Sequence, residues 1–378
     1  MKRNLFRLSR LGLAALVLLI LIVGAAGERG AVAAVSQEIS RATDAQADAL
    51  AVVSARDSNP QWKMASRPWT KEEMLAAKPY PIKTLTGEPL RDISPLNAEG
   101  TAGLISSAPP AGSKVAITTL EDQGLLAGEL LGGAAPLGYS YPAPFSRWTH
   151  FQDYKRFPYV TTGVLFFKQY GVSYRCSAAS IGNYAIWTAG HCAHAGDGLQ
   201  SGWSYDVVFV PAYKNGSAPK GSWAARNVWT LTGWYNNADL RFDNGGMVLF
   251  TNGAGQKISQ VVGNLGFAYN QSRIQHWIDL GYPVASPFNG KYMVICAASH
   301  AYNDSSMGSP ATVGIGCDMT GGSSGGPWIL NFKGSAGATN YLNGNNSYRY
   351  VGYPKEMFSP YFGTGSYNLW STLVNDTP

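Results

Sequence analysis

The loop "TGGSSGGPW", residues 320–328, contains a candidate nucleophile. Its four glycines and one proline indicate a backbone that turns tightly or lets another group approach closely. Ser324 directly precedes Gly-Gly-Pro, and the N–H groups of Gly322 and Ser324 can point into one small cavity. Such donors stabilise the oxyanion that develops when a serine attacks a carbonyl carbon. A plain turn is the alternative interpretation, and Ser323 is the neighbouring decoy.

His191 is the candidate general base. It follows a strand-like run and directly precedes Cys192 in "WTAGHCAH". A disulfide from Cys192 to Cys176 would hold the loop that presents the imidazole, and a catalytic base must be held to keep its alignment. A buried structural histidine is the plainer interpretation. A zinc site formed by Cys176, His191, Cys192 and His194 is disfavoured, because adjacent His and Cys ligands lack the usual spacing.

A carboxylate must orient the histidine, and Asp243 is the first choice. In "NNADLRFDNGGMVLF" it is followed by two glycines and an apolar run, so it enters a buried strand from a tight loop. Such a carboxylate can bind one ring nitrogen and stabilise the imidazolium. Asp239 is the second choice, and a turn aspartate is the alternative for both. The elbow motif of α/β-hydrolases is excluded, because their histidine follows the serine and no histidine follows His300 here.

Short strands must position these residues. Beyond residue 146, runs of β-branched and aromatic residues are broken by Gly, Asn and Pro, and helical periodicity is nearly absent. The pattern predicts an all-β domain over residues 146–378, a sandwich or paired barrels. The predicted strands are "TTGVLFF", "YAIWTAG", "YDVVFVPAY", "VWTLTGWY", "GGMVLF", "KYMVICAAS", "ATVGIGC", "PWILNF" and "SYRYVGY".

The N-terminal part has a different composition. A basic start and the apolar run over residues 11–27 predict a secretory signal over residues 1–33, with an uncleaved anchor as the alternative. Residues 34–145 are rich in Ala, Pro and Ser and predict a propeptide or a spacer, with a cut between residues 134 and 156. Only "TKEEMLAA" predicts a helix there, capped by Thr70. We therefore expect a secreted, extracellular product.

The charge and the cysteine content limit which binding partners, cofactors and disulfide pairs we expect. Lys and Arg are scattered and the net charge is +6 over 378 residues, so no nucleic-acid surface is predicted. We expect a monomer with no membrane contact after signal cleavage, and neither a metal nor an organic cofactor. Four cysteines permit three pairings. We favour the local pairs, Cys176 with Cys192 and Cys296 with Cys317.

"TAGHC", the aspartate that enters an apolar strand, and "GGSSGGP" together resemble the chymotrypsin-like serine endopeptidases. The likeness is closest to the secreted bacterial group around the V8-type glutamyl endopeptidases and covers about residues 156–376. It implies two six-stranded antiparallel β-barrels, with His191 and Asp243 from the first and Ser324 from the second. It also implies a cleft for an extended peptide and hydrolysis of protein or peptide substrates through an acyl-enzyme. An inactive protease-like binding module and an esterase with the same triad are the alternatives.

Two positions depart from this family's patterns. Ser323 stands where animal digestive relatives carry an aspartate that pairs with a freshly cut N-terminus. The stretch 343–350 lacks the histidine that glutamyl-specific relatives use in their specificity pocket. The sequence therefore favours neither that activation route nor glutamate specificity.

The resemblance places Asp318 and Ser347 in the substrate pocket. Asp318 lies six residues before Ser324, directly after Cys317. A carboxylate in a narrow pocket favours an Arg or Lys side chain, because an unpaired buried charge is costly. The alternative is that Asp318 pairs with a local cation such as Arg349, or caps the turn beside the disulfide.

Overall fold

The computed structural model describes residues 38, 44–93, 96, 98, 100–111, 143–149, 152–334 and 339–377. The chain forms two compact units, Met1–Ala49 and Leu50–Pro378. The predicted signal over residues 1–33 lies outside the described residues. Among the described residues, no helix has the length and apolar character needed to cross a membrane. Both sheets and the candidate site belong to the second unit.

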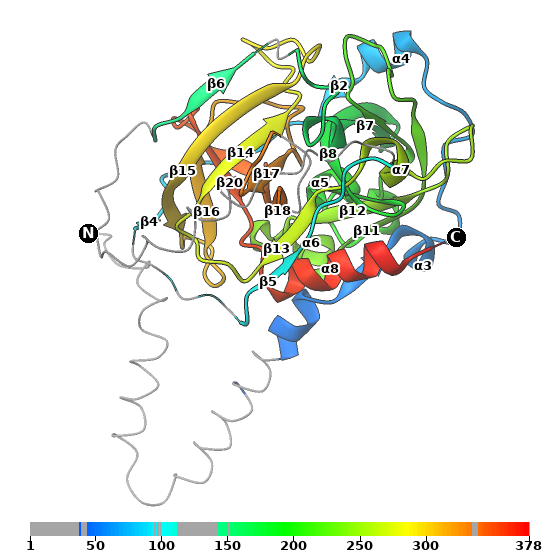
Figure 1. Ribbon diagram of the computed structural model, residues 1–378. Helices are drawn as coiled ribbons and strands as arrows, with labels where there is room; N and C mark the ends of the chain where they lie inside the picture. The colour runs from blue at the N-terminus through cyan, green and yellow to red at the C-terminus, as the bar shows by residue number, and fades with distance from the viewer. Residues whose placement is uncertain are drawn as a thin grey trace, which may run out of the picture. The chain divides into compact units, whose positions relative to one another are not determined.

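Six antiparallel strands close into the first barrel (Figure 1). The ring runs β7, β8, β9, β12, β11, β10 and back to β7. Residues 164–167 of β7 are all fully buried, so this strand has an apolar run in place of alternation. The strand bounds are β7 (Thr162–Gln169), β8 (Val172–Gly182), β9 (Ala185–Thr188), β10 (Tyr205–Pro211), β11 (Trp223–Leu231) and β12 (Gly245–Leu249).

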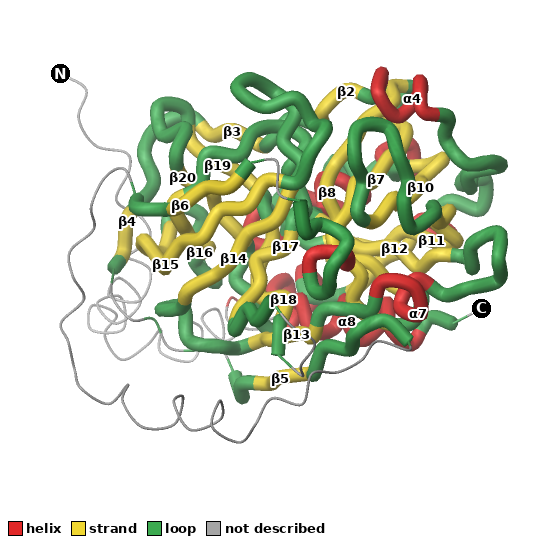
Figure 2. The backbone as a smooth tube through the Cα atoms, turned by 45° about the horizontal axis from the view of Figure 1, so that its top comes forward, coloured by secondary structure: helices red, strands yellow, loops and turns green. Residues whose placement is uncertain are grey.

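The second sheet lies beside the first and runs in the order β20, β16, β15, β14, β17, β18 (Figure 2). β19 follows β18 along the chain and pairs with β20, so the strand order returns to its first strand and the sheet closes on itself. The prediction of two antiparallel β-barrels is therefore confirmed. The bounds are β13 (Gly266–Tyr269), β14 (His276–Gly281), β15 (Val294–Asp304), β16 (Thr312–Gly316), β17 (Pro327–Leu330), β18 (Tyr341–Asn345), β19 (Tyr348–Tyr350) and β20 (Glu356–Ser359).

Helices fill the corners of this β structure. The run "VWTLTGWY" was predicted as one strand, and its second half is wrong because α6 begins at Thr232, directly after β11. The C-terminal α8 was not predicted. A Cβ added to Gly246 of β12 would lie 2.3 Å from Leu373 of α8, so a glycine in the barrel makes room for this helix. The helices of this part are α5 (Gly190–Ala193), α6 (Thr232–Asn237), α7 (Ile258–Val262) and α8 (Thr364–Asn375).

Residues 50–111, which the sequence presented as propeptide or spacer, add elements to both sheets. β1 pairs with β11 and β2 with β8 on the first barrel, and β3, β4 and β5 pair with β19, β15 and β13 of the second sheet. β6 (Ser146–Trp148) also pairs with β15. The bounds are β1 (Val52–Ser54), α3 (Ala55–Ser58), α4 (Lys71–Ala76), β2 (Lys78–Pro79), β3 (Lys83–Leu85), β4 (Arg91–Asp92) and β5 (Gly103–Ile105).

The predicted helix in this segment is confirmed as α4. Thr70 accepts a hydrogen bond from the backbone of Glu73 at 3.2 Å, and the Glu73 carboxylate accepts one from the backbone of Thr70 at 2.8 Å. This reciprocal capping box satisfies two backbone donors at the start of the helix. A local sequence signal was therefore sufficient to place this element.

Candidate active site

His191 lies on a single helical turn that follows β9. The turn is α5, and its next residue, Cys192, forms a disulfide with Cys176 of β8. The second disulfide joins Cys296 and Cys317, so the predicted local pairing is confirmed. All four sulfurs are engaged in S–S bonds, and the zinc alternative required free thiolates as ligands.

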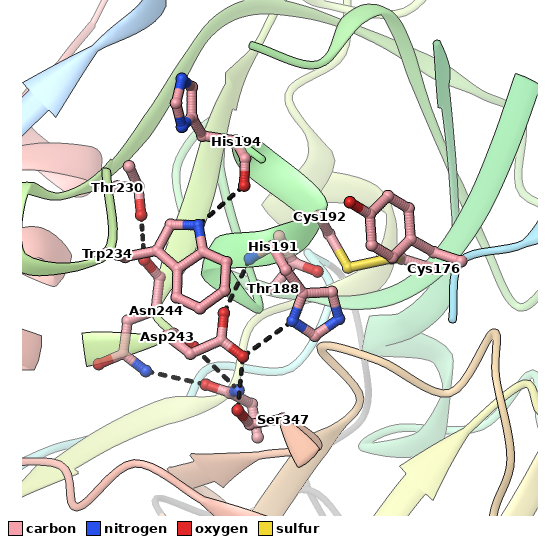
Figure 3. Close-up of polar contacts among 12 residues, drawn as sticks. Cys176, Thr188, His191, Cys192, His194, Thr230, Trp234, Asp243, Asn244 and Ser347 are labelled. Atoms are coloured by element: carbon pink, nitrogen blue, oxygen red, sulfur yellow. Dashed lines mark hydrogen bonds and ion pairs between the residues drawn. A yellow bond between two sulfur atoms is a disulfide. The ribbon is translucent and has the colours of Figure 1, made fainter. Parts of the chain in front are cut away.

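Asp243 lies beside the imidazole of His191 (Figure 3). Its Oδ2 is 2.8 Å from Nδ1 of His191, and its Oδ1 accepts a hydrogen bond from the backbone N–H of His191 at 2.8 Å. The hydroxyl of Ser347 donates to the same Oδ2 at 2.5 Å. Asp239, the second choice, instead accepts hydrogen bonds from the side chain and backbone of Arg241, so it is a turn aspartate.

The partners of Asp243 determine its charge. Burial alone would raise the pKa of this fully buried carboxyl, but the charge of His191 and hydrogen bonds from His191 and Ser347 lower the pKa below its ordinary value. Asp243 is therefore ionised at neutral pH. An ionised carboxylate at Nδ1 holds a proton on that nitrogen and leaves Nε2 to act as the base.

The loop that carries Ser324 is fixed to the first barrel. Ser177 donates from its backbone to the carbonyl of Ser324 at 2.8 Å and from its hydroxyl to the carbonyl of Gly322 at 3.0 Å. Gly322 and Gly325 have φ angles of +96° and +77°, and a Cβ on Gly325 would lie 2.0 Å from Oγ1 of Thr188. The glycines thus provide left-handed conformations and a close approach between the barrels. Sequence reasoning missed Ser177, whose one signal was its position after the disulfide cysteine of β8.

Two buried polar atoms at the site are left unpaired. Among the described residues, neither Nε2 of His191 nor Oγ of Ser324 has a hydrogen-bond partner. Buried polar groups are usually paired, so such atoms call for a chemical explanation. Oγ of Ser323 is unpaired too, but a Cβ added to Gly281 at the end of β14 would lie 3.0 Å from Cβ of Ser323. Ser323 therefore packs against β14 of the second sheet.

The two predicted pocket residues have different surroundings. Asp318 forms an ion pair with Arg147 of β6 through Oδ2. Its other oxygen is buried without a hydrogen-bond partner in the part of the chain that the structure describes. Burial lowers the pKa of Arg349, and the charge of Asp318 opposes that effect, so this alternative partner also lies within electrostatic range. Ser347 is fully buried, and its hydroxyl donates a hydrogen bond to the carboxylate of Asp243.

The paired barrels and the serine loop define a class of protein, the chymotrypsin-like serine proteases, and solved structures support this. Protease Anisep from Arthrobacter nicotinovorans is 37% identical, with a TM-score of 0.52 over 57% of this chain and 95% of that chain. The thermostable serine protease AL20 from an extremophilic microorganism is 38% identical, with a TM-score of 0.52 over 57% of this chain and 98% of that one. The chain belongs to the chymotrypsin-like serine proteases, and it is a serine protease.

Sequence comparison with curated proteins gives a narrower match. No family model matches the chain. The "Extracellular metalloprotease" of Bacillus subtilis strain 168 is 28% identical over 95 residues, 25% of this chain, and the chain spans only 29% of that relative's length. Within the described residues, each cluster of possible metal ligands contains a disulfide and one other side chain, either His191 or Asp279. The match is too short to show a family for this chain.

Proposed function

We propose that the chain is the precursor of a secreted serine endopeptidase with a His191–Asp243–Ser324 triad. Residues 1–33 are the export signal, residues 34–145 a propeptide and residues 146–378 the protease domain. The enzyme acts as a monomer on extended protein or peptide substrates. Family membership supports the protease activity, and the two disulfides are consistent with an oxidising compartment.

Acylation is the first half of the reaction. Oγ of Ser324 attacks the substrate carbonyl carbon while its proton passes to Nε2 of His191. The carbonyl oxygen becomes an oxyanion, for which the backbone N–H groups of Gly322 and Ser324 are the donors. When the intermediate collapses, the carbon–nitrogen bond breaks and His191 returns the proton to the leaving amine. Asp243 stabilises the imidazolium throughout.

Deacylation repeats these steps with water. His191 takes a proton from the water molecule as its oxygen attacks the ester carbonyl. The second oxyanion collapses, the bond to Oγ breaks, and His191 protonates Ser324. The free acid leaves, and the overall change is hydrolysis of one peptide bond without a metal or an organic cofactor.

One observation carries the assignment. Asp243 engages both the ring and the backbone of His191, and the far ring nitrogen of His191 and the Ser324 hydroxyl are left unpaired among the described residues. A structural histidine would use both ring nitrogens. His194 does so, with Nε2 at 2.8 Å from the carbonyl of Leu199 and Nδ1 accepting from Gly196.

The preference for the residue before the cut bond is a finer proposal. Asp318 favours an Arg or Lys side chain, in competition with Arg147, its partner in the structure. Peptides varied at this residue test the preference. Selection for Arg or Lys that is lost in Asp318→Ser supports the pocket role, and an unchanged preference for Glu or large apolar residues contradicts it.

Substitution of the nucleophile tests the function. In protein purified from the culture medium, Ser324→Ala and His191→Ala should each lower peptide hydrolysis by several orders of magnitude. Matched ester and amide substrates distinguish an esterase, and absence of turnover in the wild type after its N-terminal segment has been removed indicates a binding module. Full peptidase activity in Ser324→Ala would contradict the proposal.

N-terminal sequencing of the secreted protein should find a start between residues 134 and 156, and an active chain beginning near residue 34 would exclude the propeptide.

A further inference from the structure

An upstream stretch of the chain lies across the candidate active site. Residues 78–85 begin with β2 beside β8 and end with β3 beside β19, both in parallel pairing. β8 belongs to the first barrel and β19 to the second sheet, so the segment crosses from one to the other. At Tyr80 it contacts the loop that carries Ser324.

The backbone of Tyr80 forms hydrogen bonds both with β8 of the first barrel and with the loop that carries Ser324. Its N–H donates to the carbonyl of Arg175 at 2.9 Å, and its own carbonyl accepts a hydrogen bond from the N–H of Gly322 at 3.1 Å. Gly322 is the proposed oxyanion donor, so a carbonyl of the same chain already occupies that donor. A Cβ added to Gly321 would lie 3.1 Å from the same Tyr80 oxygen, which places this part of the segment directly on the serine loop.

The side chain of Tyr80 covers the proposed base. Its ring centroid is 5.4 Å from that of His191, and its hydroxyl donates to Oε1 of Gln169 at 2.7 Å. His191 and Ser324 are both 0% exposed. A base and a nucleophile that are fully covered cannot meet a peptide substrate unless the cover leaves.

Further contacts hold the segment on each side of Tyr80. Ile82 is buried in the apolar cluster of the second sheet that includes Met319 and Cys317, the residues on either side of Asp318. Nζ of Lys83 lies 5.5 Å from the ring centroid of Trp234, which itself packs edge-on against His191. Because the segment is covalently attached, it competes with substrates at a high effective concentration.

The sequence of the segment explains how it can resist cleavage. The carbonyl at the oxyanion donor belongs to Tyr80, and the next residue is Pro81. The nitrogen that would leave therefore bears a ring carbon in place of a hydrogen, and its φ is fixed by the ring. His191 would have to deliver a proton to this crowded nitrogen. The same proline restricts Tyr80 to extended conformations, which suits strand-like binding.

We propose that residues 78–85 are an intramolecular inhibitor of the active site, so that the intact chain is latent until this segment leaves. The inference rests on the proposed function, because it requires Ser324 to be a nucleophile. It adds a defined occupant, an extended Pro-Tyr-Pro strand of the same chain whose carbonyl binds Gly322. Peptides of this kind supplied in trans should bind the same site.

Access to Ser324 in the full-length chain tests this proposal. A fluorophosphonate probe is added to the wild type, Tyr80→Ala and Ile82→Asp, and labelling is followed only in the band of intact mass. Tyr80→Ala removes the cover over His191, and Ile82→Asp places a charge in an apolar cluster. We expect each to be labelled about ten-fold faster or more than the wild type, since each raises the population of the open form. Thr86→Ala, at an exposed position just beyond the segment, is the matched control and should label like the wild type.

The labelling outcomes distinguish a failure of the inhibitor proposal from a failure of the proposed protease function. Equal, rapid labelling of intact wild type and variants would overturn the inhibitor while leaving the nucleophile in place. Absence of labelling in every form, including the variants, would overturn the proposed function itself.

A synthetic peptide of residues 76–87 should inhibit the Tyr80→Ala chain and remain whole by mass spectrometry. Rapid cleavage between Tyr80 and Pro81 would make the segment a substrate and overturn the proposal.

Discussion

Two fully buried carboxyl groups, Asp243 beside the first barrel and Asp279 in the second sheet, are in opposite states. Asp243 beside the first barrel has a pKa below its ordinary value, because His191 and Ser347 outweigh the effect of burial. Asp279 on β14 has a pKa well above its ordinary value, since burial is opposed only by a hydrogen bond from Asn346. Its Oδ2 has no partner among the described residues. Partners therefore decide whether a buried carboxyl is charged, and the charged one is at the proposed active site.

The largest expected effect comes from neutralising the charged member of this pair. Asp243→Asn keeps the shape but can leave His191 with its proton on the wrong nitrogen. We expect kcat for a peptide substrate to fall by about ten-thousand-fold. Asp239→Asn is the control, because that carboxylate contacts Arg241 and should leave kcat unchanged. A similar loss in both variants would contradict the distinction between them.

Removing one donor from Asp243 should have a smaller effect. Ser347→Ala deletes a hydrogen bond of the kind made to charged groups, and we expect kcat to fall roughly ten-fold with little change in KM. Steady-state kinetics separate the two parameters. A change in KM alone would return Ser347 to the substrate pocket, where the sequence placed it, and would remove it as a positioning residue.

Neutralising Asp279 should stabilise the protein. Its folded pKa is raised, so the folded state binds a proton that the unfolded state releases above about pH 4. Stability is therefore lost as pH rises from that value toward the folded pKa. Asp279→Asn should raise the free energy of unfolding at pH 7 by about 1 kcal/mol or more, and the gain should vanish near pH 4. Thermal unfolding at the two pH values measures this, and a loss of stability at pH 7 would refute it.

Asp243 has the opposite linkage and serves as the internal comparison. Its folded pKa is lowered, so its contribution to stability is present above the unfolded value and is lost as pH falls through the folded pKa. In the same unfolding series, Asp243→Asn should therefore destabilise the protein at pH 7 and approach the wild type in acid. Parallel behaviour of the two variants would mean that burial alone governs both carboxyls.

The smallest effect concerns a third, partly exposed carboxylate. Asp318 already has a cationic partner in Arg147. Arg147→Ala should raise kcat/KM for Arg or Lys before the cut bond a few-fold relative to neutral residues, because exposed pairs contribute about 1 kcal/mol or less. The matched control is Arg147→Lys, which retains the positive charge at this position. Unchanged selectivity in Arg147→Ala would separate Asp318 from substrate recognition.

Local sequence signals pointed to the residues of the proposed triad, whereas the pairing of distant segments left no signal in the sequence. His191 and Ser324 became candidates because each is surrounded by residues that its proposed role requires. The capping box at Thr70 placed α4 for the same reason. Ser177 was missed because its role depends on a loop far along the chain, and a serine in a buried strand carries no signal for that contact.

In the N-terminal segment, too, the contacts with distant parts of the chain left no signal in the sequence. β2 and β3 have two and three residues, too few to show any alternation, and their partners lie far along the chain. The sheet edges that receive them exist only after the barrels have folded. Composition alone therefore presented residues 34–145 as propeptide or spacer, and it could not predict that Tyr80 reaches Gly322. The weak apolar face of α8, with small residues at Gly365 and Ser366, hid that helix as well.

The most direct test of the account is to map the fluorophosphonate adduct by mass spectrometry in the Tyr80→Ala chain. We expect one modified residue, Ser324, and no modification when His191→Ala or Asp243→Asn is combined with Tyr80→Ala. Ser323, whose hydroxyl is also buried and unpaired among the described residues, is the built-in comparison. An adduct on Ser323, or an adduct on Ser324 that forms at the same rate without His191, would contradict the proposed triad.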